Sequence, residues 1–126
     1  MFSPLIEPLL IAWLGQHLGL TGTTELDNDL LNDLPVVQVT RVGGDDDGFR
    51  LDRTLIDVDV YAATQQTAAE LSELIRDGML RSLRGSAGDT AVIGKVKTVS
   101  APSRRPYENT SLRRYGATYE LFVHPA

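Results

Sequence analysis

Two stretches of alternating apolar and polar residues are about twice as long as an ordinary β-strand. One spans Leu51–Ala62 and the other spans Leu112–His124. At about 3.3 Å per residue each would extend roughly 40 Å, whereas most strands have about 5–6 residues. A chain of 126 residues has too little core to cover both along their whole length. We therefore expect their surplus to pair with or pack on another molecule, which favours a role in assembly over catalysis.

The length and composition are those of one globular domain, and we expect that domain to span residues 1–126. The chain has no cysteine, so disulfides and thiolate metal sites are excluded. The apolar segment Met1–Leu20 lacks a basic start and is interrupted by Pro4, Glu7 and Pro8. We interpret it as an amphipathic helix and expect no membrane partner.

Capping residues and apolar spacing predict the order of the elements. The expected elements are a helix capped by Ser3 that ends at Gly19, a strand over 36–42, a flexible hairpin tip over 43–48, the long strand, a helix capped by Thr64 or Thr67 that ends near Arg84, a strand over 91–100, a loop over 101–110 and the closing strand. This α-β-β-α-β-β order predicts an α+β fold. It would have one mixed or antiparallel four-stranded sheet with long strands and helices packed on it.

Charge is divided unevenly between the two halves of the chain. Residues 1–63 carry three basic and eleven acidic side chains, whereas residues 64–126 carry nine basic and six acidic ones. The acidic total argues against a dedicated nucleic-acid binder. Opposite signs on the two halves suit head-to-tail self-association, and the alternative is chance clustering on solvated surfaces.

Two groups of aspartates are candidate sites. The consecutive Asp45, Asp46 and Asp47 lack the alternate spacing of a calcium loop and are typical of a solvated hairpin tip. Asp57 and Asp59 share one strand face about 6.6 Å apart, a separation compatible with glycosidase or metal chemistry. No histidine or glutamate supports such a site, so we expect the pair to face solvent or the arginines of an adjacent subunit.

No other pattern indicates catalysis. The sequence contains no nucleophile elbow, P-loop or dinucleotide fingerprint, and we expect no enzyme activity, cofactor or bound metal. The remaining cluster is basic and aromatic, and its members are Arg104, Arg105, Tyr107, Arg113, Arg114 and Tyr115. Tyrosine and arginine are common at protein interfaces, and the acidic total favours contact with protein over single-stranded nucleic acid.

Several segments resemble tail terminator, or tail-completion, proteins of long-tailed bacteriophages. The segments are Leu34–Val39 followed by Gly43-Gly44, then Asp57–Ala62, the alanine-rich helix from Thr64 and the closing run Arg114–Val123. The resemblance covers about Pro4 to Val123. It implies a hexameric ring on the last ring of the tail tube, which stops tube growth and meets the head-side connector while genomic DNA passes through its lumen.

The resemblance carries over no catalytic residues. It implies a virion protein of the tail or neck, assembled in the host cytoplasm, whose partners are its own copies, the tail tube protein and the head-side connector. We expect the subunit or neck interface to include Asp45, Asp46, Asp47, Asp57, Asp59, Arg104, Arg105, Tyr107 and Arg113. The alternatives are another neck, connector or minor tail protein, or a small ligand-binding domain or enzyme that uses the Asp57/Asp59 face.

Overall fold

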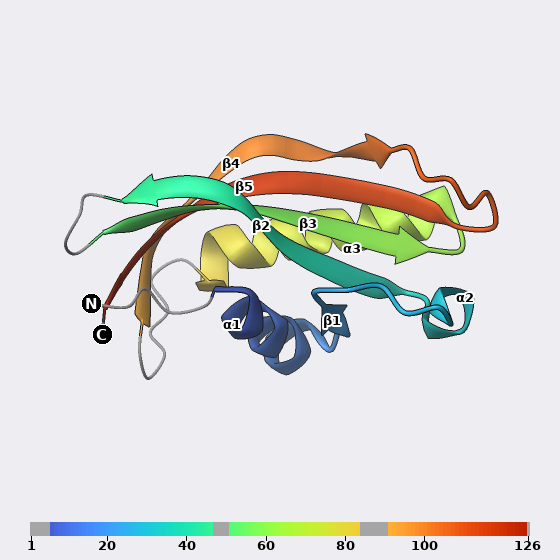
Figure 1. Ribbon diagram of the computed structural model, residues 1–126, viewed down its shortest axis with the longest axis horizontal. Helices are drawn as coiled ribbons and strands as arrows, with labels where there is room; N and C mark the ends of the chain where they lie inside the picture. The colour runs from blue at the N-terminus through green and yellow to red at the C-terminus, as the bar shows by residue number, and fades with distance from the viewer. Residues whose placement is uncertain (1–5, 47–50, 84–90, 126) are drawn as a thin grey trace.

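A curved five-stranded sheet forms the centre of the molecule, with helices along one of its faces (Figure 1). The computed structural model describes residues 6–46, 51–83 and 91–125. The strands are β1 (Gly22–Thr23), β2 (Val36–Asp46), β3 (Asp52–Ala62), β4 (Ala91–Arg105) and β5 (Arg113–Pro125). The helices are α1 (Ile6–Trp13), continued by a π-helical turn η1 (Leu14–Leu18), then α2 (Leu30–Asp33) and α3 (Gln65–Gly78), continued by η2 (Met79–Leu83).

The sheet has the order β1-β2-β3-β5-β4. The α+β class and the two long strands are confirmed, but the four-stranded sheet was wrong because β1 adds a fifth strand. β1 lies parallel to β2, with Gly22 opposite Val37, so the sheet is mixed. A strand of two residues is too short to show alternation, so no pattern in the sequence predicts it.

The hairpin between β2 and β3 is paired further than expected. Gly43 and Gly44 were assigned to a flexible tip, yet they pair with Leu55 and Thr54. A bulge after Arg41 accommodates one extra residue, and both glycines adopt positive φ angles of 144° and 122°. At Gly44 a Cβ atom would lie 2.0 Å from the carbonyl oxygen of Arg53. Glycine therefore allows the strand to continue where a side chain would break the pairing.

Strand β4 also continues through residues that were expected to form a loop. It runs to Arg105 rather than ending at Ser100. Three register shifts against β5 accommodate Gly94, Val99 and the Ala101-Pro102 pair. Bulges of this kind let irregular residues remain within a strand, so the proline that predicted a loop lies inside β4.

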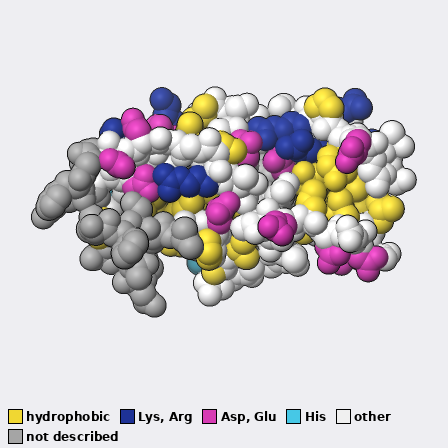
Figure 2. Space-filling model, viewed as in Figure 1, with side chains coloured by type: hydrophobic (Ala, Val, Ile, Leu, Met, Phe, Trp, Pro, Cys, Tyr) yellow, Lys and Arg dark blue, Asp and Glu magenta, His cyan; other side chains and the backbone are white. Residues whose placement is uncertain are grey.

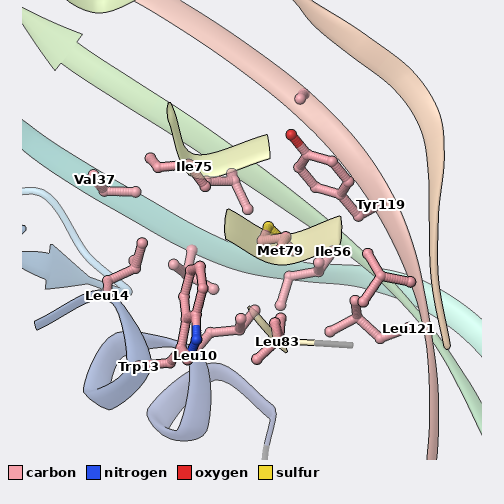
Figure 3. Close-up of a cluster of buried hydrophobic side chains, with 14 of the residues drawn as sticks. Leu10, Trp13, Leu14, Val37, Ile56, Ile75, Met79, Leu83, Tyr119 and Leu121 are labelled. Carbon is pink, nitrogen blue, oxygen red and sulfur yellow. The ribbon is translucent and has the colours of Figure 1, made fainter. Parts of the chain in front are cut away.

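The hydrophobic core lies between the sheet and the helices α1 and α3 (Figure 3). Ile56, Val58, Val60 and Ala62 of β3 all point into it, as their alternation predicted. In Figure 3 Leu10 and Trp13 of α1 and Ile75 of α3 point toward the sheet. Both helices cover the same face, and they leave the other face of the sheet open (Figure 1). At one end of that other face, Leu30 of α2 packs in a small cluster with Val36 and Tyr61.

The helix boundaries follow the expected capping residues where they are described. Gly19 ends the first helical segment in the left-handed region, with φ of 66°. Thr64, rather than Thr67, caps α3, since its side chain accepts a hydrogen bond from the Thr67 amide. The expected start at Ser3 and the expected stop near Arg84 lie outside the described residues.

Candidate functional site: the open face of the sheet

The sheet face opposite the helices, called here the open face, carries polar and charged side chains near its middle. Figure 2 views this face and shows basic and acidic side chains in contact over β5 and β3, with an apolar patch toward the end near α2. The open face is formed by side chains that alternate with the core residues. They are Gln38 and Thr40 of β2, Leu55, Asp57, Asp59 and Tyr61 of β3, Arg114, Thr118 and Glu120 of β5, and Arg105 of β4.

Asp59 is the centre of the charged cluster. Arg105 donates a hydrogen bond from Nη1 to Asp59 Oδ1 at 3.0 Å. Arg114 donates two more, from Nε to Oδ1 and from Nη2 to Oδ2, both at 3.1 Å. The Asp59 side chain is only 3% exposed. A carboxylate so far removed from water is tolerated because two guanidinium groups neutralise it, one of them in bidentate geometry.

Asp57 joins the same cluster through two neighbours. Arg105 Nη1 lies 3.5 Å from Asp57 Oδ2, and the Thr118 hydroxyl donates a hydrogen bond to Asp57 Oδ1. Arg105 Nη2 also donates to the Thr118 hydroxyl at 3.1 Å. Arg105 therefore bridges both aspartates and connects β4 to β3 across the intervening strand β5. The expectation that these aspartates face solvent or a neighbouring subunit's arginines was wrong, because arginines of the same chain bind them.

The arrangement determines what Asp57 and Asp59 can do chemically. Both carboxylates accept hydrogen bonds from cationic or hydroxyl donors that hold them in place. These contacts make the pair a cross-strand clamp that connects β3, β5 and β4 on the open face.

Tyr61 extends the cluster toward the apolar patch. Its hydroxyl donates to Gln38 Oε1 at 3.0 Å, and Tyr107 packs edge-on against its ring with centroids 5.2 Å apart. Burial raises the pKa of Tyr61 to about 12. The hydrogen bonds to Asp59 raise the pKa of Arg114, although burial opposes them. The burial of Tyr61 comes from a small second hydrophobic cluster, whose buried members are Leu30, Val36, Tyr61 and Leu112.

The remaining predicted residues are spread over the sheet. Asp45 forms an ion pair with Arg53 near the opposite end of the sheet from Arg105. Asp46 lies in β2 in register with Asp52. Asp45 and Asp46 therefore belong to a strand rather than to the expected hairpin tip. Asp47 lies outside the described residues.

On the C-terminal side, Arg104 and Arg105 likewise lie in a strand, β4, rather than in a loop. The Arg113 guanidinium donates to the backbone carbonyls of Thr110 and Leu112 at 2.8 and 3.1 Å. The structure thus brings Asp57, Asp59, Arg105 and Tyr107 to one region and leaves the acidic β2 residues remote from them.

Three residues of β5 were missing from the predicted site. Arg114 was recognised only as part of a basic stretch, while Gly116 and Thr118 were overlooked. The alternation of the closing strand places all three on the face opposite Tyr115, Ala117 and Tyr119. That spacing was the available signal, but it does not say which residues of β3 they oppose.

The described residues contain neither a cluster of metal-binding side chains nor a helix able to span a membrane. Within residues 6–46, 51–83 and 91–125, no three histidine, cysteine or acidic side chains lie together in a way that could hold a metal ion. In the same ranges no helix combines the length and the apolar character that crossing a bilayer requires.

The comparison with protein families gives a match over nearly the whole chain. The model of the phage tail termination proteins matches residues 2–124. The chain belongs to this family. Membership gives it a structural role in the virion tail and implies contacts with the tail tube and with head-side proteins. Comparison with curated proteins finds no significant match.

Proposed function

We propose that copies of this chain form a ring, expected to be a hexamer, on the last ring of the tail tube. The ring ends tube polymerisation and provides the surface on which the head joins the tail. The observation that carries this proposal is the match to the tail termination family over residues 2–124. Genomic DNA passes through the lumen without sequence-specific contacts, and the acidic chain, with net charge −5, is consistent with that role.

The shape of the subunit supports a role in assembly. Strands β2, β3, β4 and β5 have 11, 11, 15 and 13 residues, well above the usual length. Helices α1 and α3 cover one face of this sheet, and the Asp59 cluster links β3, β4 and β5 across the open face. A polar face that these two helices leave open is suited to contacts with a neighbouring protein. In this proposal residues 1–126 act as one domain, assembled into virions in the host cytoplasm.

Some residues of the proposed interface hold the surface in shape, and others would contact the neighbouring protein directly. Asp57, Asp59 and Arg105 maintain the open face, and Tyr107 packs on it against Tyr61. Arg104 and Arg113 lie at the same end of the sheet, in register with Tyr115 and Ala62 of the core face. Asp45 and Asp46 lie at the other end of the sheet, and together with Asp47, which is outside the described residues, they would meet a different neighbour. Charge reversal at Asp45–Asp47 together with Arg104 and Arg105 should impair ring formation or head joining. Normal assembly after both changes would remove these residues from the interface.

A phage that lacks this chain tests the proposed function. Electron microscopy should show tails of abnormal length that do not join heads, and supplying the chain in trans should restore normal virions. Tails of normal length that fail to join heads would instead indicate a head-side connector. Solution mass and negative-stain images of the purified chain, with and without the tail tube protein, would show whether it forms a closed ring.

A further inference from the structure

The ion pairs within the sheet show which of its acidic groups are already neutralised. β1, with α2 close by, lies at one edge, and β4 lies at the opposite edge (Figure 1). Several aspartates in the first half of the chain are paired with arginines of the same chain. These pairs are Asp45 with Arg53, Asp52 with Arg41, and Asp57 and Asp59 with Arg105. The unneutralised acidic groups must therefore be sought elsewhere.

Three acidic side chains that form no ion pair within the described residues lie around a cleft at the β1 edge, called here the acidic cleft, with a volume of about 290 Å³. Its lining consists of Thr21, Thr23, Glu25, Leu26, Asp27, Leu30, Asp33 and Val36. The three apolar residues give it a hydrophobic surface, and the three acidic residues carry charges that no cation of the described chain pairs with. A cleft of this composition fits a side chain with an apolar stem and a cationic head.

Such side chains occur on the opposite edge of the same sheet. Lys97 and Arg104 of β4 are exposed, and neither forms an ion pair with the described residues. Val99 lies between them and is 53% exposed. At the acidic edge, Leu31 of α2 is 51% exposed beside the cleft residue Leu30. Each edge thus combines unneutralised charge of one sign with an exposed aliphatic side chain.

Neither edge is well suited to joining sheets through the backbone. At the β2 edge, the Val37 amide donates to the Thr21 carbonyl at 2.9 Å, and the Arg41 amide donates to the Glu7 carboxylate at 3.0 Å. The three bulges of β4 interrupt the regular pattern that a further strand would need. Protected edges of this kind disfavour strand addition, so contact between the edges would rely on side chains.

We propose that the acidic cleft of one copy receives the Lys97–Arg104 segment of β4 from the next copy. This inference rests on the proposed ring and names the contact that would build it. The two surfaces lie on different edges of one subunit, so the contact is heterologous, and repetition around a closed rotation produces a ring. A second copy is favoured over another basic partner because charge and aliphatic surface on the two edges of this one chain are complementary.

Two charge-reversed variants test the pairing. The cleft variant carries Asp27→Lys and Asp33→Lys, and the strand variant carries Lys97→Glu and Arg104→Glu. Each alone would bring like charges together, so we expect self-association to weaken at least tenfold for either one. An equimolar mixture should assemble again, because the cleft of each variant then meets the β4 edge of the other. The readout is native mass spectrometry with negative-stain imaging, in the presence of the tail tube protein.

Matched controls change the same number of charges on α3 and η2. Glu70→Lys with Glu73→Lys controls the cleft variant, and Arg76→Glu with Arg81→Glu controls the strand variant. Both controls should assemble as the wild type does. Far-UV circular dichroism checks folding. If a reversed variant does not fold, the milder Asp33→Asn and Arg104→Gln variants should weaken assembly in the same direction.

The outcomes separate this inference from the proposed function. Rings that persist in both reversed variants, or a mixture that stays unassembled, would overturn the cleft-to-β4 contact and leave the tail-terminating role intact. A wild-type chain that forms no ring with the tail tube protein would overturn the ring proposal, and this contact with it. Recovery of assembly only in the mixture would establish the contact.

Discussion

Gly116 lies directly opposite Asp59 in the pairing of β5 with β3, and the Asp59 carboxylate occupies the space that a side chain at position 116 would need. A Cβ atom there would be 2.0 Å from Asp59 Oδ1 and 2.8 Å from Arg105 Cδ. The absence of a side chain at Gly116 thus allows the carboxylate to lie over β5, between the two arginines that neutralise it.

We expect Gly116→Ala to destabilise the protein by about 2–4 kcal/mol, because the added methyl group would displace a buried carboxylate from its cations. Thermal or denaturant unfolding measures the change. Gly94→Ala on β4 is the control, since its Cβ would approach no atom closer than 3.4 Å, at the ring of His124. Equal stability of the two variants would show that Gly116 makes no special room for Asp59.

Asp59→Asn should destabilise the protein more than Asp45→Asn. The first change leaves Arg105 and Arg114 without their shared anion in a largely buried position, which we expect to cost about 2–3 kcal/mol after allowance for partial exposure of the arginines. The Asp45 side chain is 66% exposed, and pairs of that kind contribute about 0–1 kcal/mol. Urea unfolding of both variants tests this order, and the reverse order would contradict the clamp role.

Stability should fall in alkaline solution partly through Tyr61. Its folded pKa is about 12, above the ordinary value of about 10, so the folded state retains the phenol proton where the unfolded state loses it. The stabilisation is complete below about pH 10 and is lost as the pH rises toward 12. Tyr61→Phe should therefore make the unfolding free energy decline less steeply between roughly pH 10 and pH 12, where the proton of Tyr61 is lost from the unfolded state first. An unchanged slope would show that Tyr61 does not titrate this way.

Thr64→Ala should cost about 1 kcal/mol of stability, since it removes the acceptor for the Thr67 amide at the start of α3. Thr67→Ala is the matched control. Its hydroxyl accepts a hydrogen bond from Thr64 but caps no backbone amide in α3, so the expected loss is smaller. Circular dichroism during thermal unfolding measures both losses of stability. A larger loss for Thr67→Ala would show that Thr64 is not the residue that caps α3.

Local rules predicted much of the fold. Alternation in β3 and β5 correctly separated core residues such as Ile56 and Val58 from the open face, because a strand's period of two is a property of the backbone itself. The glycine stop at Gly19 and a threonine cap before α3 were likewise readable, since caps act within a few residues. Irregular strands were not readable. Pro102 and the Gly43-Gly44 pair indicate loops locally, and only pairing with a neighbouring strand keeps them within β4 and β2.

The sequence by itself determined, through the alternation of each strand, that Asp59 lies on the polar face of β3 and that Arg114 and Gly116 share one face of β5. Only the tertiary structure decided that they meet. Arg105 and Arg114 are 46 and 55 residues from Asp59 along the chain, and the register of β3, β5 and β4 brings them together. That register is set by the bulges of β4 and by packing of the core against α1 and α3. Long-range pairing depends on the free energy of the whole sheet, so no short stretch of sequence contains it.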